Sequence, residues 1–191
     1  MGSKAAKLIL TIFTLMIVGG AYFLVDEYCH QKFIEGFREG QEDYKDFCIY
    51  VITSLTLSDI RFHSKVALNS LERDSAGAFN LSMVELKSDF MMLGWTLVES
   101  AMYLFPDEFP DNKTLANMTE TYHCFTFVEL SQKAFLNGTA NVSAVREGLI
   151  LIHDFATEWR GSHNYPSEEL LKANAELQRK CGELVQRVKA S

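Results

Sequence analysis

Helical periodicity runs along most of the chain and limits its fold more than any other feature. Between Asp26 and about Ile60, apolar residues follow the i, i+4, i+7 spacing of a long amphipathic helix, at Phe33, Phe37, Tyr44, Cys48, Val51 and Leu55. Alternation at period two is almost absent, and the 191 residues include only three prolines. We therefore predict an all-α protein with one domain, an up-and-down helical bundle of five or six helices.

The segment after the first helix contains two boundary signals. A shorter piece, Phe62–Leu71, either continues the first helix or folds back, and Asp74–Gly77 interrupts the pattern. Ser82-Met-Val-Glu85 matches a capping box, which predicts that a helix begins there. That helix is apolar on nearly all sides, so we expect it at the centre of the bundle; its large apolar residues are Phe90, Met91, Met92, Leu93, Trp95, Leu97, Met102 and Leu104.

The second half of the sequence predicts helices separated by turns. Pro106–Thr114 is a predicted loop, Asn137-Gly138 a predicted turn, and Gly161–Pro166 a predicted helix stop. The expected helices are Ala116–Leu136, Ala144–Arg160 capped by Ser143, and Ser167–Lys189. The last helix has a heptad seam at Leu170, Asn174, Leu177, Cys181, Leu184 and Val188, typical of a coiled-coil dimer or of an ordinary bundle helix, and its short length favours the latter.

The N-terminus has the order of a membrane-targeting segment. Lys4 and Lys7 precede the apolar run Leu8–Val18, and small residues follow at Gly19, Gly20 and Ala21. Residues 1–25 are therefore either a cleaved signal peptide or a type II signal anchor, because Leu8–Val25 is just long enough to span a bilayer. Residues 26–191 would then form one extracytoplasmic domain.

Five Asn-x-Ser/Thr sequons follow this segment, and none has proline at its middle position. A chain of this Ser/Thr content would contain about one by chance, so they indicate passage through the secretory pathway. The predicted glycosylation sites are Asn80, Asn112, Asn117, Asn137 and Asn141. Together with the N-terminus they predict a secreted protein, or a type II membrane protein whose C-terminal domain is luminal or extracellular.

The four cysteines predict two disulfides in such an oxidising compartment. Cys29 and Cys48 lie nearly 30 Å apart if the first helix is continuous, because a helix rises about 1.5 Å per residue, so they cannot pair with each other. Of the two remaining connectivities we prefer Cys29–Cys181 with Cys48–Cys124 over Cys29–Cys124 with Cys48–Cys181. The preference assumes that Phe62–Leu71 is a separate helix that folds back.

No set of residues matches an established catalytic or metal-binding pattern. Glu27-x-x-His30 and Glu120-x-x-His123 resemble half-sites of di-iron helical bundles, but the preferred disulfides place them at opposite ends. His153, Asp154, Ser162 and His163 are residue types of a hydrolase triad, yet no nucleophile elbow accompanies them. Glu99 is a candidate for a buried acid in a pocket. The interpretation we prefer is that its side chain faces solvent or pairs with a lysine or arginine. We therefore expect no cofactor, no metal and no enzymatic activity.

The net negative charge limits the classes of partner that the protein is expected to bind. A formal charge of -7 disfavours nucleic acid and anionic lipid, and leaves the N-terminal segment as the only expected membrane contact. Our first hypothesis is a non-enzymatic glycoprotein that binds another extracellular protein. The sequon-free surface of the first helix and Ala144–Lys189 is the expected docking face. The alternative is a carrier of a small hydrophobic ligand in the bundle core, beside the Met- and Phe-rich central helix.

Overall fold

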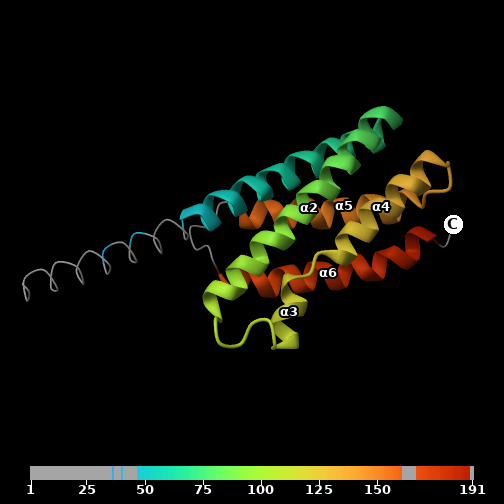
Figure 1. Cartoon of the computed structure of the whole chain (residues 1–191). Coiled ribbons are helices and arrows are strands. Elements are labelled where there is room, and N and C mark those ends of the chain that lie inside the picture. The colour runs from blue at the N-terminus through green and yellow to red at the C-terminus, as the bar shows by residue number, and fades with distance from the viewer. Residues whose placement is uncertain (1–35, 37–39, 41–46, 161–166, 190–191) are drawn as a thin grey trace, which may run out of the picture. The chain divides into compact units, whose positions relative to one another are not determined.

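The computed structural model describes residues 36, 40, 47–160 and 167–189, and these form helices and turns with no strand (Figure 1). The all-α prediction is confirmed for this part of the chain. Contacts divide the chain into two units, Met1–Lys45 and Asp46–Ser191, and every helix named below belongs to the second. The predicted signal or anchor at residues 1–25, and Cys29, lie outside the described residues. Across the ranges just given, no helix combines the length and the hydrophobicity that crossing a membrane requires.

A single helix covers residues 47–72, so Phe62–Leu71 continues the preceding helix and does not fold back. It ends at a tight turn in which the Ser75 amide donates to the Ser70 carbonyl at 2.9 Å. Asp74 adopts the left-handed conformation there, with φ of 51°, which Asp tolerates better than most residues. This turn reverses the chain directly into the next helix.

Helix α2 spans Ala76–Leu104 and begins six residues before the predicted capping box. Ser82 therefore lies inside the helix, where its hydroxyl donates to the Ala78 carbonyl at 2.9 Å. The capping-box prediction was wrong because a serine hydroxyl can also bond to the carbonyl one turn earlier within a helix. The inner face of α2 is fully buried at Phe79, Met83, Leu86, Phe90, Leu93 and Leu97.

The predicted helix Ala116–Leu136 is two helices, α3 at Lys113–Thr119 and α4 at Tyr122–Leu136. Asn112 caps α3, because its side-chain oxygen accepts from the amides of Thr114 at 3.0 Å and Leu115 at 3.4 Å. The chain is extended at Glu120, with φ of -66° and ψ of 144°, which separates the two helices.

The last two helices follow the predicted order with corrected starts. After Asn137-Gly138, where Gly138 has φ of 67°, helix α5 spans Val142–Trp159. Its cap is Asn141 and not the predicted Ser143, because the Asn141 side-chain oxygen accepts from the Ala144 amide at 3.2 Å. Helix α6 spans Glu168–Lys189.

Helix α6 packs against α3, α4 and α5, while α2 packs against α3 and α4 (Figure 1). The heptad seam of α6 faces these neighbours, because each of its members is at most 4 % exposed: Leu170, Asn174, Leu177, Cys181, Leu184 and Val188. The interpretation of α6 as an ordinary bundle helix is therefore confirmed. Helix 47–72, the inner face of α2, α4, α5 and α6 together enclose the core of the described unit.

Candidate functional site

The most unusual surface of the described unit is the outer side of α2. Apolar side chains there are far more exposed than the core residues: Leu81 is 62 %, Val84 44 %, Met91 66 %, Trp95 57 % and Met102 46 % exposed. With Ser88 and the half-buried Val98 between them, they recur at alternating spacings of three and four residues. We call these seven residues the α2 stripe.

The α2 stripe lies on the opposite side of the helix from the buried inner face. At about 100° per residue, its members fall within one arc of roughly 100°, and the buried residues fall on the far side. The stripe is about 32 Å long, from about 1.5 Å of rise per residue. The expectation that α2 lies at the centre of the bundle was therefore wrong: its apolar residues serve two faces, and only one is covered in the described unit.

One edge of the stripe is acidic and borders helix 47–72. Asp89 Oδ2 lies 2.7 Å from His63 Nδ1, and both side chains are mostly buried. Burial raises the pKa of Asp89 to about 6; the hydrogen bond and charge of His63 oppose the shift, and Asp59 and Glu85 add to it. Three carboxyl groups thus gather along this edge. We call Asp59, Glu85 and Asp89 the acidic edge.

The opposite edge of the stripe is fixed against α4 and the chain that leads into it. Gln132 of α4 donates to the Asn80 side-chain oxygen at 2.6 Å and to its carbonyl at 3.2 Å. A Cβ at Gly94 would lie 2.9 Å from the Thr121 hydroxyl oxygen, so only glycine allows the two segments to approach this closely. Contacts on both edges therefore hold α2 with its stripe facing outward.

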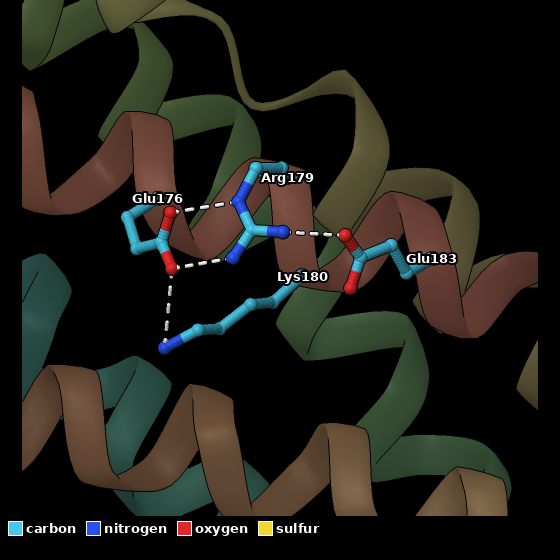
Figure 2. A network of polar contacts seen from close by, with 4 residues as sticks. All are labelled: Glu176, Arg179, Lys180 and Glu183. Atoms are coloured by element: carbon cyan, nitrogen blue, oxygen red, sulfur yellow. Dashed lines mark hydrogen bonds and ion pairs between the residues drawn. The ribbon is translucent and has the colours of Figure 1, made fainter.

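The outer side of α6 shows how another exposed helix face in this protein is built. There Arg179 bonds Glu176 through two nitrogens, at 2.8 and 2.7 Å, and also bonds Glu183, while Lys180 lies 3.4 Å from Glu176 (Figure 2). The Arg179 and Lys180 contacts lower the pKa of Glu176 to about 2. This face belongs to the sequon-free surface expected to bind a partner, but it is charged and well solvated, unlike the α2 stripe.

The predicted cysteine pairing differs from the arrangement that the structure shows. Cys48, Cys124 and Cys181 are free thiols, and Cys124 Sγ lies 3.1 Å from Cys181 Sγ. The expected Cys48–Cys124 bond is not formed, and Cys29 of the expected Cys29–Cys181 bond lies outside the described residues. The Cys48–Cys124 pairing assumed that Phe62–Leu71 folds back, whereas that segment continues helix 47–72.

A buried polar network joins α6 to the start of α4, and the sequence did not predict it. Asn174 donates through Nδ2 to the carbonyls of Met118 at 2.8 Å and Glu120 at 2.9 Å. Gln178 accepts from the Cys124 amide at 3.0 Å and donates to Cys124 Sγ at 3.0 Å. The pair satisfies backbone groups at the break between α3 and α4. Asn174, a polar residue within the apolar α6 seam, is the sequence signal from which this network could have been predicted.

The predicted glycosylation sites differ in exposure. Asn117 and Asn137 are exposed, whereas Asn80, Asn112 and Asn141 are half-buried. Asn112 and Asn141 also cap helices, and their Nδ2 atoms donate to Glu108 Oε2 at 3.0 Å and the Arg187 carbonyl at 3.4 Å. A glycosylated asparagine keeps one N–H, so the caps and a glycan are chemically compatible.

The candidate catalytic and metal residues are scattered where they can be placed. His153 Nδ1 lies 3.3 Å from the Ser64 hydroxyl and 3.1 Å from the Arg61 carbonyl, while Ser162 and His163 lie outside the described residues. Ser64 is fully buried and donates to Arg61, so this contact is part of the packing. His123 lies against α6 beside Gly182, and Glu27 and His30 are outside the described residues. Within the described ranges no cluster of three or more His, Cys, Asp or Glu residues could hold a metal.

Two hollows of the described unit lie at its surface. One of about 360 Å³ is lined by a single helix, at Arg61, Phe62, Lys65, Val66 and Asn69. Another of about 240 Å³ lies between α5 and α6 and includes the charged side chains of Asp154, Glu158, Glu176 and Lys180. Both are open to solvent, whereas a site for a hydrophobic ligand is expected to be enclosed.

Comparison with known proteins returned no match: no family model, no curated protein and no solved structure is similar to this chain.

Proposed function

We propose that this protein is a non-enzymatic, N-glycosylated helical bundle of the secretory pathway that binds another extracellular protein through the α2 stripe. Residues 1–25 act as its signal peptide or membrane anchor. The observation that carries the proposal is the exposed apolar stripe opposite the buried face of α2. The largest contiguous apolar patch on the surface of a soluble protein is often functional.

The spacing of the stripe indicates a helical partner. Apolar side chains at alternating spacings of three and four accept the side chains of a second helix between them. The contact would extend over about six turns of one helix, a small interface of the kind found in weak and transient complexes. We therefore expect a micromolar dissociation constant for a single helix.

The acidic charge beside the stripe favours a different protein as the partner over a second copy of this chain. The acidic edge runs beside the stripe, and the whole chain has a formal charge of -7. Two copies paired antiparallel would bring their acidic edges together across the helix pair, whereas a partner with lysine or arginine beside its apolar seam would pair with the acidic groups. The proposed occupant is an amphipathic helix with basic flanks, on a different extracellular protein.

The carrier alternative receives less support. Met83 and Phe90, from the helix expected to line a ligand cavity, are fully buried among core side chains. The described hollows that could admit a small molecule lie on the surface and contain charged groups. A packed interior is what a protein-binding bundle requires.

The test uses a defined probe, a helical peptide of about four heptads with leucine at the a and d positions and lysine on the flanks. A second peptide has glutamate on the flanks. Binding is followed by the fluorescence of Trp95, which lies on the stripe and should shift to shorter wavelength when covered. The lysine peptide should bind at micromolar concentration and the glutamate peptide at least tenfold more weakly.

Matched variants locate the contact. Met91→Asp and Trp95→Asp each place a charge on the stripe and should abolish binding of the lysine peptide. Because Trp95→Asp removes the fluorescent reporter, binding to that variant is measured with a labelled peptide. Ile150→Asp changes another exposed apolar residue, on α5, and should leave the affinity unchanged. Equal binding of the two peptides, equal losses in all variants, or no binding of the lysine peptide would contradict the proposal. Concentration-dependent dimerisation lost in Met91→Asp would identify a second copy as the occupant instead.

A further inference from the structure

The two buried cysteines of the described helices face each other across the contact between α4 and α6. Their sulfur atoms lie 3.1 Å apart, and both side chains are fully buried. A disulfide joins its sulfurs at about 2.0 Å, so the two atoms need to approach by only about 1 Å. Cys124 lies in the first turn of α4 and Cys181 within the α6 seam.

The surrounding network holds the two sulfurs in register. Gln178 bonds both the amide and the sulfur of Cys124, each at 3.0 Å, and lies one turn before Cys181 on α6. Asn174, a further turn away, bonds the carbonyls of Met118 and Glu120 just before α4. Two side chains of α6 thus fix the start of α4 through its backbone groups, which leaves the thiols positioned for bond formation.

We propose that Cys124 and Cys181 form an intramolecular disulfide that joins α4 to α6 in the mature protein. The proposal rests on the secretory compartment of the proposed function, but not on its partner-binding face. It replaces the pairing expected from the sequence. Cys48, which is half-buried at the start of helix 47–72, takes no part in this bond.

The bond forms by thiol–disulfide exchange with an oxidised small disulfide such as oxidised glutathione. One cysteine thiolate attacks a glutathione sulfur, which forms a mixed disulfide and releases one reduced glutathione. The second cysteine thiolate then attacks the protein sulfur of the mixed disulfide and releases the other. Two protein thiols lose two protons and two electrons, and one glutathione disulfide becomes two thiols. Burial raises the pKa of the Cys124 thiol, so exchange takes place during folding, before α6 covers α4.

Peptide mapping under non-reducing conditions tests the pairing. Protein from the medium or membranes of secretory cells is alkylated, deglycosylated because Asn117 shares a tryptic peptide with Cys124, and digested with trypsin. The expected result joins Thr114–Lys133 to Cys181–Arg187, with Asp46–Arg61, which contains Cys48, outside that link. A link between Asp46–Arg61 and Thr114–Lys133 would overturn the proposal.

A second measurement separates the bond from its compartment. The unglycosylated protein is refolded in a buffer of oxidised and reduced glutathione and melted before and after reduction. Reduction should lower the melting temperature by roughly 5–15 °C in the wild type and in Cys48→Ser, but not in Cys124→Ser. Free Cys124 and Cys181 after this refolding would refute the pairing itself. The link in refolded protein together with free thiols in material from secretory cells would refute the compartment on which the proposal rests.

Discussion

Replacing Gly148 with alanine should destabilise the protein, because a ring of α4 occupies the space where the new methyl group would lie. A Cβ at this position would be 2.1 Å from Phe127 Cζ and 2.6 Å from Cε1 and Cε2. Carbon atoms in ordinary contact are about 3.5–4.0 Å apart, and Phe127 is fully buried. The ring therefore cannot turn into solvent, and α4 and α5 must separate.

The magnitude follows from two opposing effects. Overpacking a close-packed core costs about 1–3 kcal/mol, and an approach this short belongs at the upper end. Alanine returns about 1 kcal/mol, because glycine is the poorer residue in a helix interior. We expect a net loss of about 2 kcal/mol in the free energy of unfolding. In urea this corresponds to a midpoint lower by about 1 M, at the slope usual for a domain of this size.

Urea denaturation followed by circular dichroism measures the change, with Gly77→Ala as the matched control. Gly77 is in the first turn of α2, and a Cβ there meets nothing within 4 Å, so this variant should be slightly more stable than the wild type. Phe127→Leu combined with Gly148→Ala should recover part of the loss, because the two residues share one space. A Gly148→Ala variant as stable as Gly77→Ala would refute the close packing of α4 against α5.

Three further predictions concern other parts of the molecule. Asp89 has its pKa raised from 3.8 to about 6, so the stability that its protonated form contributes is fully present below about pH 4 and lost as pH rises through 6. As pH rises from 5 to 7.5, the unfolding free energy of Asp89→Asn should therefore increase by about 1 kcal/mol relative to that of the wild type, after allowance for partial solvent screening. A difference between the two proteins that stays the same at every pH would contradict this. Asn174→Ala removes a buried side chain and leaves two partly buried carbonyls without their donor, so it should lower the free energy of unfolding by about 2 kcal/mol in urea denaturation. An unchanged midpoint would mean that the network contributes no stability. Protein from secretory cells should lose mass on treatment with an N-glycan-removing enzyme, and an unchanged mass would exclude the secretory compartment.

The helices were predictable from the sequence because their apolar spacing is strong, and most of their boundaries were predicted to within two residues. The start of α2 and the break between α3 and α4 were not. The α6 seam and the Asn137-Gly138 turn were recognised from local pattern alone, and the structure confirms both. Ser82 was taken for a cap because an interior serine and a capping serine have the same local sequence; the difference lies in the backbone. The break between α3 and α4 depends on Asn174, which is more than fifty residues away.

The candidate site was harder to predict for a related reason. Hydropathy identified α2 as apolar on nearly all sides, but it could not show which side its neighbours leave uncovered. That depends on the positions of helix 47–72 and α4 around it, fixed by contacts such as His63–Asp89 and Gln132–Asn80. The cysteine contact likewise depends on whether Phe62–Leu71 continues the first helix or folds back, and the sequence pattern allowed both.

Site-specific photo-crosslinking tests the central claim that the α2 stripe binds another protein. A photoreactive amino acid replaces Met91 on the stripe in one sample and Ile150 on α5 in another, and both are expressed in secretory cells. Crosslinking from position 91 should yield one discrete product that contains a second, different protein, and adding Trp95→Asp should remove it. Position 150 should yield none. Equal products from the two positions, or none from position 91, would contradict the proposed binding face.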